Sequence, residues 1–270
     1  MKHTLPDGLQ MYYEIHGNSH SNTRLLLLNG VTQSTLAWYF LLPALHSYEI
    51  VLVDFIFQGQ SDKTGPVRSF DQHAADLMSL LSALPPKETI PVGISYGGMV
   101  AQHLLFQNQT SFKRAVLLST MAYKSEYFKT VEVSWHQALA FGGYPLLLDV
   151  MLPYVLSESY FEHPLIPVAD MKKLRASVNT AAEPIFKLMA ATRERKDYRP
   201  ELAQISVPCL VIHGEADLLF PLSVGQAVAD ALPNAEFVVI PNAGHTLNLE
   251  GIPLVVSAIQ TFVSRTNSGS

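Results

Sequence analysis

The chain has 270 residues, of which 48% are hydrophobic and 15% are charged. This composition excludes an intrinsically disordered chain and supports a large buried core. The formal net charge is −5 and no basic run occurs, which argues against nucleic acid or an anionic membrane surface as a partner.

Short apolar runs along the chain predict the strands of a mostly parallel sheet. The first, Leu9–His16, alternates apolar and polar residues, which is typical of an antiparallel edge strand. The later runs are continuously apolar, as expected for strands that are covered on both faces. They span Arg24–Leu28, Glu49–Asp54, Thr89–Gly93, Arg114–Leu118, Cys209–Gly214 and Glu236–Ile240.

Helical patterns lie between these runs, at Phe70–Leu84, Tyr96–Gln107, Val224–Leu232 and Pro253–Val263. The resulting alternation of strands and helices indicates an α/β fold with an open, mostly parallel sheet and helices on both sides.

The alternation stops between about Ala122 and Arg199, where no convincing strand occurs. We interpret this region as a helical insertion over the carboxyl edge of the sheet. Its aromatic and methionine side chains form either the insertion's own core or the lining of an apolar acyl pocket. Its basic residues are expected on solvated faces; they are Lys172, Lys173, Arg175, Arg193, Arg195 and Lys196.

The segment Gly93-Ile94-Ser95-Tyr96-Gly97-Gly98 fits the pattern G-x-S-x-G between a predicted strand and a predicted helix. A sharp strand-to-helix turn strains its central residue and crowds the residues two positions away, which favours glycine at 93 and 97. Ser95 would lie at a helix N-terminus, where the Tyr96 amide can donate to an oxyanion. The alternative is an ordinary glycine-rich turn with a capping serine, but the strand–turn–helix setting favours a nucleophile.

Asp217 ends the segment His213-Gly214-Glu215-Ala216-Asp217, directly after a buried predicted strand. Open α/β sheets place functional groups at such strand ends, and a carboxylate there can hold an imidazole base in one tautomer. Asp217 could instead cap a helix that begins near Pro221. Glu215 is the nearby rival, which we expect to point outward or into a local loop contact.

His245 lies in Asn242-Ala243-Gly244-His245-Thr246, just after the last predicted strand. It is either a surface histidine or a base that reaches across the sheet edge to a nucleophile. We expect structural or surface roles for His213, His73, His103 and His136, which end a strand or lie in helical stretches. The chain order Ser95, Asp217, His245 is the nucleophile–acid–base order of α/β-hydrolases, and it predicts a catalytic triad.

The loop Asn29-Gly30-Val31-Thr32 follows the first parallel strand. The fold takes its second oxyanion donor from this loop, so we nominate the Val31 amide together with that of Tyr96. The stretch Asp54–Ser61 is expected to be a structural turn that shapes the site. The candidate substrate-contacting residues are Gly30, Met121 and Trp135.

These residues resemble the α/β-hydrolase superfamily, and the likeness covers nearly the whole chain. It is strongest at Leu25–Val31, Asp54–Ser61, Gly93–Gly98, Val211–Asp217 and Asn242–His245. The resemblance implies the α/β-hydrolase fold, with a core domain at 1–121 and 200–265 and a helical cap at 122–199. The residues at 266–270, Thr-Asn-Ser-Gly-Ser, are themselves expected to form a flexible tail. It also implies that Ser95 is the nucleophile, Asp217 the acid and His245 the base, with Val31 and Tyr96 as oxyanion donors.

The sequence departs from the common superfamily pattern at two places. Asn29-Gly30 stands where many relatives have His-Gly, and D-F-I-F-Q-G-Q-S at 54–61 replaces Asp-x-Arg-Gly-x-Gly-x-Ser. Both departures look similar to the hydroxyalkanoyloxyalkanoate synthases of the rhamnolipid pathway, which use the same machinery for acyl transfer. The acceptor of the acyl group is therefore either water or another hydroxyl.

The leading functional hypothesis is a serine hydrolase that cleaves a carboxylic ester or lactone through an acyl-enzyme. One alternative is an acyltransferase that acts on hydroxyacyl thioesters, and another is a ligand receptor with slow turnover. The expected partner is thus a small-molecule acyl ester, lactone or thioester. Epoxide hydrolases and dehalogenases of this fold use an aspartate nucleophile, so Ser95 argues against them.

No metal or organic cofactor is expected, because the mechanism needs none and no His/Cys cluster has metal-ligand spacing. Cys209 is the only cysteine, which rules out an internal disulfide and fits a cytoplasmic setting. The first eight residues lack an apolar signal-peptide core, and no apolar run reaches the ~18 residues of a membrane span. No motif predicts an oligomeric state.

Overall fold

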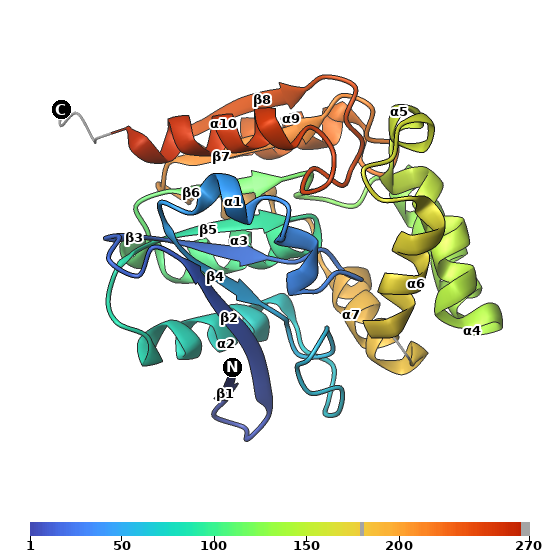
Figure 1. The fold of residues 1–270 in the computed structure, drawn as a ribbon, viewed down its shortest axis with the longest axis horizontal. Coiled ribbons are helices and arrows are strands. Elements are labelled where there is room, and N and C mark those ends of the chain that lie inside the picture. Colours follow the sequence, from blue (N-terminus) through green and yellow to red (C-terminus); the bar gives the residue numbers. More distant parts are fainter. Residues whose placement is uncertain (179–180, 266–270) are drawn as a thin grey trace.

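The computed structural model describes residues 1–178 and 181–265, so the tail predicted at 266–270 lies outside the described residues. An eight-stranded sheet crosses the molecule in the order β1-β2-β4-β3-β5-β6-β7-β8 (Figure 1). The strands are β1 (Lys2–Thr4), β2 (Gln10–Gly17), β3 (Thr23–Leu28), β4 (Glu49–Val53), β5 (Glu88–Ile94), β6 (Ala115–Leu118), β7 (Cys209–Gly214) and β8 (Ala235–Ile240). Strands β3 to β8 are parallel, and the predicted α/β fold is confirmed.

The antiparallel strand predicted at Leu9–His16 is β2, which pairs with β4. The prediction that it forms the edge of the sheet is wrong, because β1 pairs along its free side with Lys2 opposite Tyr12. β1 has only three residues, too few for alternation to reveal a strand in the sequence.

Helices cover both faces of the sheet. They are α1 (Leu42–Leu45), α2 (Phe70–Ala83), α3 (Tyr96–Gln107), α4 (Glu126–Val155), α5 (Glu158–Glu162), α6 (Val168–Val178), α7 (Ala182–Glu194), α8 (Arg199–Leu202), α9 (Leu222–Ala231) and α10 (Ile252–Ser264), with 3₁₀ turns η1 (Thr35–Trp38) and η2 (Gln109–Ser111). Side chains of β3 alternate between the two layers: Leu26 and Leu28 pack with α2 and α3, whereas Leu25 and Leu27 pack with α1 and α10. This two-sided burial explains why β3 to β7 are continuously apolar. The expectation that β8 is covered on both faces is wrong, because β8 lies at the edge of the sheet and is partly exposed.

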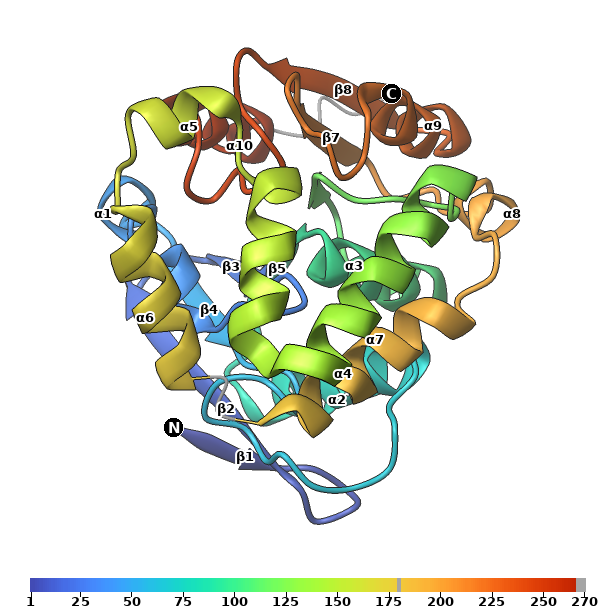
Figure 2. The same cartoon turned by 90° about the vertical axis from the view of Figure 1, so that its right-hand side faces the viewer.

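The helices α4 to α7 lie beyond the carboxyl ends of the parallel strands (Figures 1 and 2). The long helix α4 begins at the cap residue Ser125, whose Oγ accepts a hydrogen bond from the Phe128 amide. It bends sharply at Gly143, where φ is 64° and ψ is −162°. By length and composition α4 would suffice to cross a membrane, but this bend divides it, and Trp135 and Met151 from its two halves are both buried in the protein core.

Arg195 ends the helical segment in a buried position, so the expectation that it lies on a solvated face is wrong. Its guanidinium donates to the carbonyls of Met121 and Ala122, each at 3.1 Å, and to Oε1 of Gln102 at 2.5 Å. Burial lowers the pKa of Arg195 to about 10. The side chain thus ties the end of α7 to the loop after β6, a contact between residues more than 70 positions apart.

Cys209, the first residue of β7, should be unreactive in the folded protein. The side chain is fully buried, and burial raises the pKa of its thiol to about 12. Because the thiolate is the reactive species, we expect Ellman's reagent to leave the native protein unmodified near neutral pH. The unfolded chain should react with one equivalent, since it contains one cysteine. Rapid reaction of the native protein would contradict this packing.

Candidate active site

Ser95 occupies a sharp turn between β5 and α3. Its backbone has φ 53° and ψ −112°, a conformation that non-glycine residues rarely adopt. The turn is held from both sides, because the Ser95 amide donates to the Leu118 carbonyl at 2.9 Å and the Met99 amide donates to the Ser95 carbonyl at 3.0 Å. These two hydrogen bonds hold Ser95 in its strained backbone conformation at the carboxyl edge of the sheet.

The glycines on either side of Ser95 allow this turn to form. A Cβ atom at Gly93 would lie 2.3 Å from the Gly97 carbonyl oxygen, and one at Gly97 would lie 2.2 Å from that of Leu28. Neither position has room for a side chain. The spacing of these glycines in the sequence thus reflects the close approach of β5, α3 and the end of β3.

Asp217 and His245 come together at the same edge of the sheet, from the loops after β7 and β8. His245 Nδ1 lies 2.8 Å from Asp217 Oδ2, and both residues are buried. The other carboxylate oxygen, Oδ1, accepts the backbone amides of Leu219 and Phe220, each at 2.9 Å. An ionised carboxylate can only accept, so His245 donates from Nδ1 and leaves the lone pair on Nε2.

Glu215, the rival acid, does not contact His245. Its Oε2 accepts the Asn242 amide at 3.1 Å, a local loop contact of the kind expected from the sequence. His213 is fully buried and its Nε2 donates to the Phe220 carbonyl at 2.7 Å. Burial lowers the pKa of His213, which keeps that ring neutral beside Asp217.

Ser95 and His245 line one central cavity. Three further residues that the sequence analysis proposed for the site, Gly30, Val31 and Trp135, line this cavity as well. The other lining residues are Thr32, Gln33, Ile94, Met151, Val155, Arg175, Leu219 and Thr246. The structure thus brings residues that lie up to 216 positions apart in the chain, Gly30 and Thr246, to one space. The helical segment supplies Trp135, Met151, Val155 and Arg175.

A second space, which we call the inner pocket, also reaches Ser95 and adjoins the central cavity. Its lining includes the two nominated oxyanion donors, Val31 and Tyr96, and Trp135. The other lining residues are Met99, Phe128, Glu132, Met189, Thr192, Leu219 and Phe220. Met121, by contrast, lines neither the central cavity nor the inner pocket and is 0% exposed, so the geometry does not support it as a substrate contact.

The two departures from the superfamily pattern meet behind the Val31 loop. Gln58 Nε2 donates to the carbonyls of Gly30 at 2.8 Å and Val31 at 3.1 Å. Asn29 Nδ2 donates to the Val53 carbonyl at 2.7 Å, and its Oδ1 accepts from Trp38 Nε1 at 2.9 Å. These two side chains therefore fix the loop that carries the nominated donor.

Replacing Gln58 should weaken catalysis by loosening this loop. In Gln58→Ala the carbonyls of Gly30 and Val31 lose a shared donor, and we expect kcat to fall by roughly tenfold with a smaller change in KM. Gln60→Ala, which alters a neighbouring glutamine outside this contact, is the control. A purely KM-based defect in Gln58→Ala, measured with a chromogenic ester, would argue against a role in holding an oxyanion donor.

Glu250 is a buried residue that sequence reasoning missed. Its Oε2 accepts from Ser157 Oγ at 2.5 Å, from the Ser157 amide at 3.1 Å and from the Gly244 amide at 3.2 Å. Burial raises the pKa of this carboxyl. The contact joins the residue before His245 to the start of α5, and a 93-residue separation leaves no local signal for it.

The fold and the site define the class of protein: a serine at a nucleophile turn and a paired aspartate and histidine at the carboxyl edge of a mostly parallel sheet characterise α/β hydrolases. The chain belongs to the alpha/beta hydrolase family, whose model matches residues 25–258, and it is a hydrolase. Among the described residues, no group of three or more His, Cys, Asp or Glu side chains could hold a metal ion.

Individual relatives agree with this assignment. The hydrolase YugF of Bacillus subtilis (strain 168) is 26% identical over 269 residues, which cover 95% of each chain. The α/β hydrolase MGS-M2, from a Medee basin deep-sea metagenome library, superposes with a TM-score of 0.89 at 24% identity, covering 100% of this chain and 99% of its own. The enol-lactonase of Burkholderia xenovorans LB400 gives a TM-score of 0.86 at 23% identity, covering 98% and 100% of the two chains. These structural likenesses establish the shared fold.

Proposed function

We propose that the protein is a serine hydrolase that cleaves a carboxylic ester or lactone through an acyl-enzyme on Ser95. One observation carries the proposal: His245, paired with Asp217 at 2.8 Å, lines the same cavity as Ser95. The pairing directs the free Nε2 of His245 away from Asp217, as a general base requires. The enol-lactonase, which is 23% identical, is by its name an enzyme of this class, and the substrate proposed for this chain is argued from its own site.

In the proposed mechanism, His245 Nε2 takes the hydroxyl proton of Ser95 while its oxygen attacks the ester carbonyl. The amides of Val31 and Tyr96 would stabilise the oxyanion, each contributing roughly 10²–10³ in rate. The carbon–oxygen bond to the alcohol then breaks, and the alcohol takes the proton from His245. A water molecule that gives its proton to His245 attacks the acyl-enzyme, and the acid is released as Ser95 regains its proton.

We further propose that residues 122–199 act as a cap on a core domain formed by 1–121 and 200–265. The cap supplies Phe128, Trp135 and Met189 to the inner pocket beside Ser95. These side chains favour an acyl group that is apolar.

Transfer of the acyl group to a hydroxyl other than water is the second candidate. The observation that favours it is the contact of Asn29 and Gln58 with the loop behind the site, since these residues are where the chain resembles hydroxyalkanoyloxyalkanoate synthases. Both candidates share the acyl-enzyme and differ only in the acceptor.

Product analysis tests the proposal and separates the two candidates. The wild-type protein is incubated with p-nitrophenyl butyrate, with and without a 3-hydroxyalkanoate acceptor, and products are resolved by mass spectrometry. Hydrolysis predicts butyrate as the main product in both reactions. If the butyryl ester of the acceptor is the main product, acyl transfer replaces hydrolysis as the proposed function. Saturable binding of the ester without turnover would contradict both hydrolysis and transfer.

A further inference from the structure

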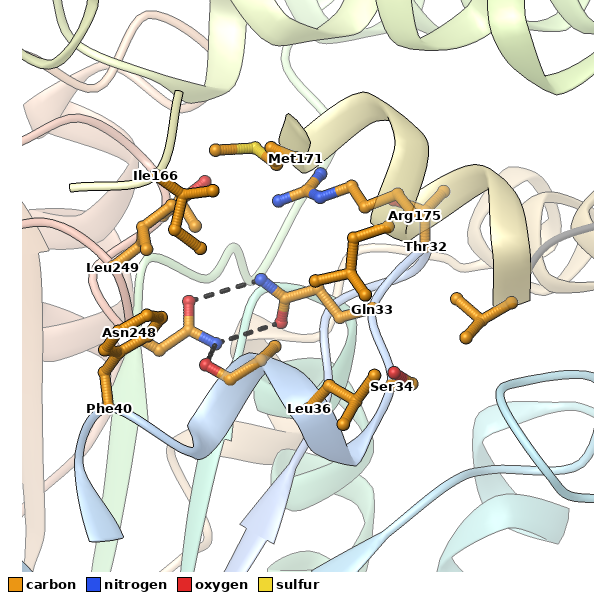
Figure 3. A pocket seen from close by; sticks show the side chains of 14 residues that line it. Thr32, Gln33, Ser34, Leu36, Phe40, Ile166, Met171, Arg175, Asn248 and Leu249 are labelled. Atoms are coloured by element: carbon orange, nitrogen blue, oxygen red, sulfur yellow. Dashed lines mark hydrogen bonds between the residues drawn. The ribbon is translucent and has the colours of Figure 1, made fainter. Parts of the chain in front are cut away.

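The cavity around Ser95 continues into a third space, which we call the outer cleft. It lies between η1 and α6, and most of its lining residues are apolar, among them Leu36, Phe40, Ile166, Met171 and Leu249 (Figure 3). Thr32, Gln33, Arg175 and Thr246 line both the outer cleft and the central cavity, so the two spaces adjoin. A substrate at Ser95 can therefore extend in two directions, into the inner pocket and into the outer cleft.

The position of His245 indicates which of these two spaces holds the acyl group of an ester and which holds its alcohol group. The group that protonates the leaving alcohol must lie within hydrogen-bond reach of its oxygen. His245 lines the central cavity, on the side that leads past Thr246 to the outer cleft, and it does not line the inner pocket. The alcohol portion therefore leaves toward the outer cleft, while the acyl chain lies in the inner pocket beside Tyr96.

Arg175 of α6 stands at the junction of the central cavity and the outer cleft. Of the described residues that line these two spaces, it is the one Lys, Arg, Asp or Glu side chain. Figure 3 shows its guanidinium group reaching into the cleft from α6, toward the side where Gln33 and Asn248 lie. From the sequence we expected Arg175 on a solvated face. In the structure its side chain lines both the central cavity and the outer cleft.

A pair of hydrogen-bonded amide side chains forms the floor of the cleft near Arg175 (Figure 3). Gln33 Nε2 donates to Asn248 Oδ1 at 3.2 Å, and Asn248 Nδ2 donates to Gln33 Oε1 at 3.3 Å. Gln33 Oε1 also accepts the Gly30 amide at 2.9 Å, which connects this floor to the loop of Val31. The positive charge of Arg175 lies near this polar floor and between apolar side chains. This arrangement favours the binding of one anionic group beside the Arg175 guanidinium.

We propose that the alcohol portion of the substrate carries a carboxylate and that Arg175 binds it, so that the substrate is an acyl ester of a hydroxy acid. This inference rests on the proposed function, in which Ser95 takes the acyl group. A single guanidinium matches the single charge and two oxygens of a carboxylate. Most of the other lining residues are apolar, which suits an aliphatic chain between the ester oxygen and the carboxylate.

The test uses matched esters that differ only in charge. Butyryl esters of 3-hydroxypropanoate, 4-hydroxybutanoate and 6-hydroxyhexanoate are compared with the esters of the corresponding carboxamides, and kcat/KM is measured from butyrate release. For at least one chain length, wild type should prefer the carboxylate by about tenfold or more. Arg175→Gln should bring the ratio of the two kcat/KM values close to one, and Arg175→Lys should restore part of it.

Lys173→Gln is the control for long-range electrostatics. It removes a positive charge from the same helix, but its side chain is 80% exposed and lines neither space. The carboxylate preference should survive in this variant. A ratio near one in wild type at every chain length, or an equal loss in Lys173→Gln and Arg175→Gln, would overturn the inference.

A binding measurement separates this inference from the proposed function. Calorimetry with Ser95→Ala should give tighter binding of the carboxylate ester than of its carboxamide, and Ser95→Ala/Arg175→Gln should lose the difference. Labelling of Ser95 by a fluorophosphonate without any carboxylate preference would refute the inference and leave the acyl-enzyme standing. A carboxylate preference in binding without Ser95 labelling would refute the acyl-enzyme and leave the Arg175 site standing.

Discussion

Ser95→Ala should abolish ester hydrolysis and leave the fold intact. Removal of the nucleophile from a hydrolytic triad lowers kcat by a factor on the order of 10⁴–10⁶. Alanine meets the same backbone restriction as serine at φ 53°, and the hydrogen bonds that hold the turn come from the backbone. We therefore expect an unchanged circular-dichroism spectrum and a melting temperature close to that of wild type.

A fluorophosphonate probe gives the second readout for Ser95. Wild type should be labelled once, at Ser95, and Ser95→Ala should not be labelled. Ser134→Ala is a matched control, because the Ser134 hydroxyl only donates to the Val131 carbonyl of its own helix and lines neither cavity beside Ser95. Labelling that persists in Ser95→Ala, or is lost in Ser134→Ala, would remove Ser95 from its proposed role.

Asp217→Asn should lower kcat by about 10⁴-fold through the tautomer of His245. The amide oxygen of asparagine must face the Leu219 and Phe220 amides, which now donate to Oδ1 of Asp217. Its NH₂ group would then point at His245 Nδ1 and force that nitrogen to accept. The proton would move to Nε2, so the ring could no longer take the proton of Ser95.

Glu215→Gln is the control for this substitution. The side chain keeps an oxygen that can accept the Asn242 amide, and it has no contact with His245. Its kcat should stay within a few-fold of wild type, measured with the same chromogenic ester. If Glu215→Gln were the severely impaired variant and Asp217→Asn remained active, the acid of the site would have to be reassigned to Glu215.

Local patterns were sufficient to predict the fold and the candidate triad. Parallel strands buried on both faces must be apolar throughout, so β3 to β7 could be located from their apolar runs. The apolar run of β8 also marked a strand, although this edge strand is partly exposed. The turn at Ser95 requires glycine at 93 and 97 because neighbouring carbonyls lie within 2.3 Å of where a Cβ atom would be. Parallel strands end at one edge, so residues that follow β5, β7 and β8 were expected to meet there.

Contacts that join distant segments could not be predicted in this way. Arg175 and Arg195 look alike in the sequence as basic residues of a helical region, yet Arg195 is buried against the Met121 carbonyl and Arg175 lines the cavity at Ser95. Met121 looked like a substrate contact and is instead packed in the core.

The sequence by itself determined the layered sheet, the position of the strained turn and the order of Ser95, Asp217 and His245 along the chain. These features depend on steric and hydrophobic requirements within a few residues of each position. Only the tertiary structure decided which side chains hold the Val31 loop and which face of α6 borders the cavity. Such choices depend on how separate elements pack against one another, and no local pattern records that packing.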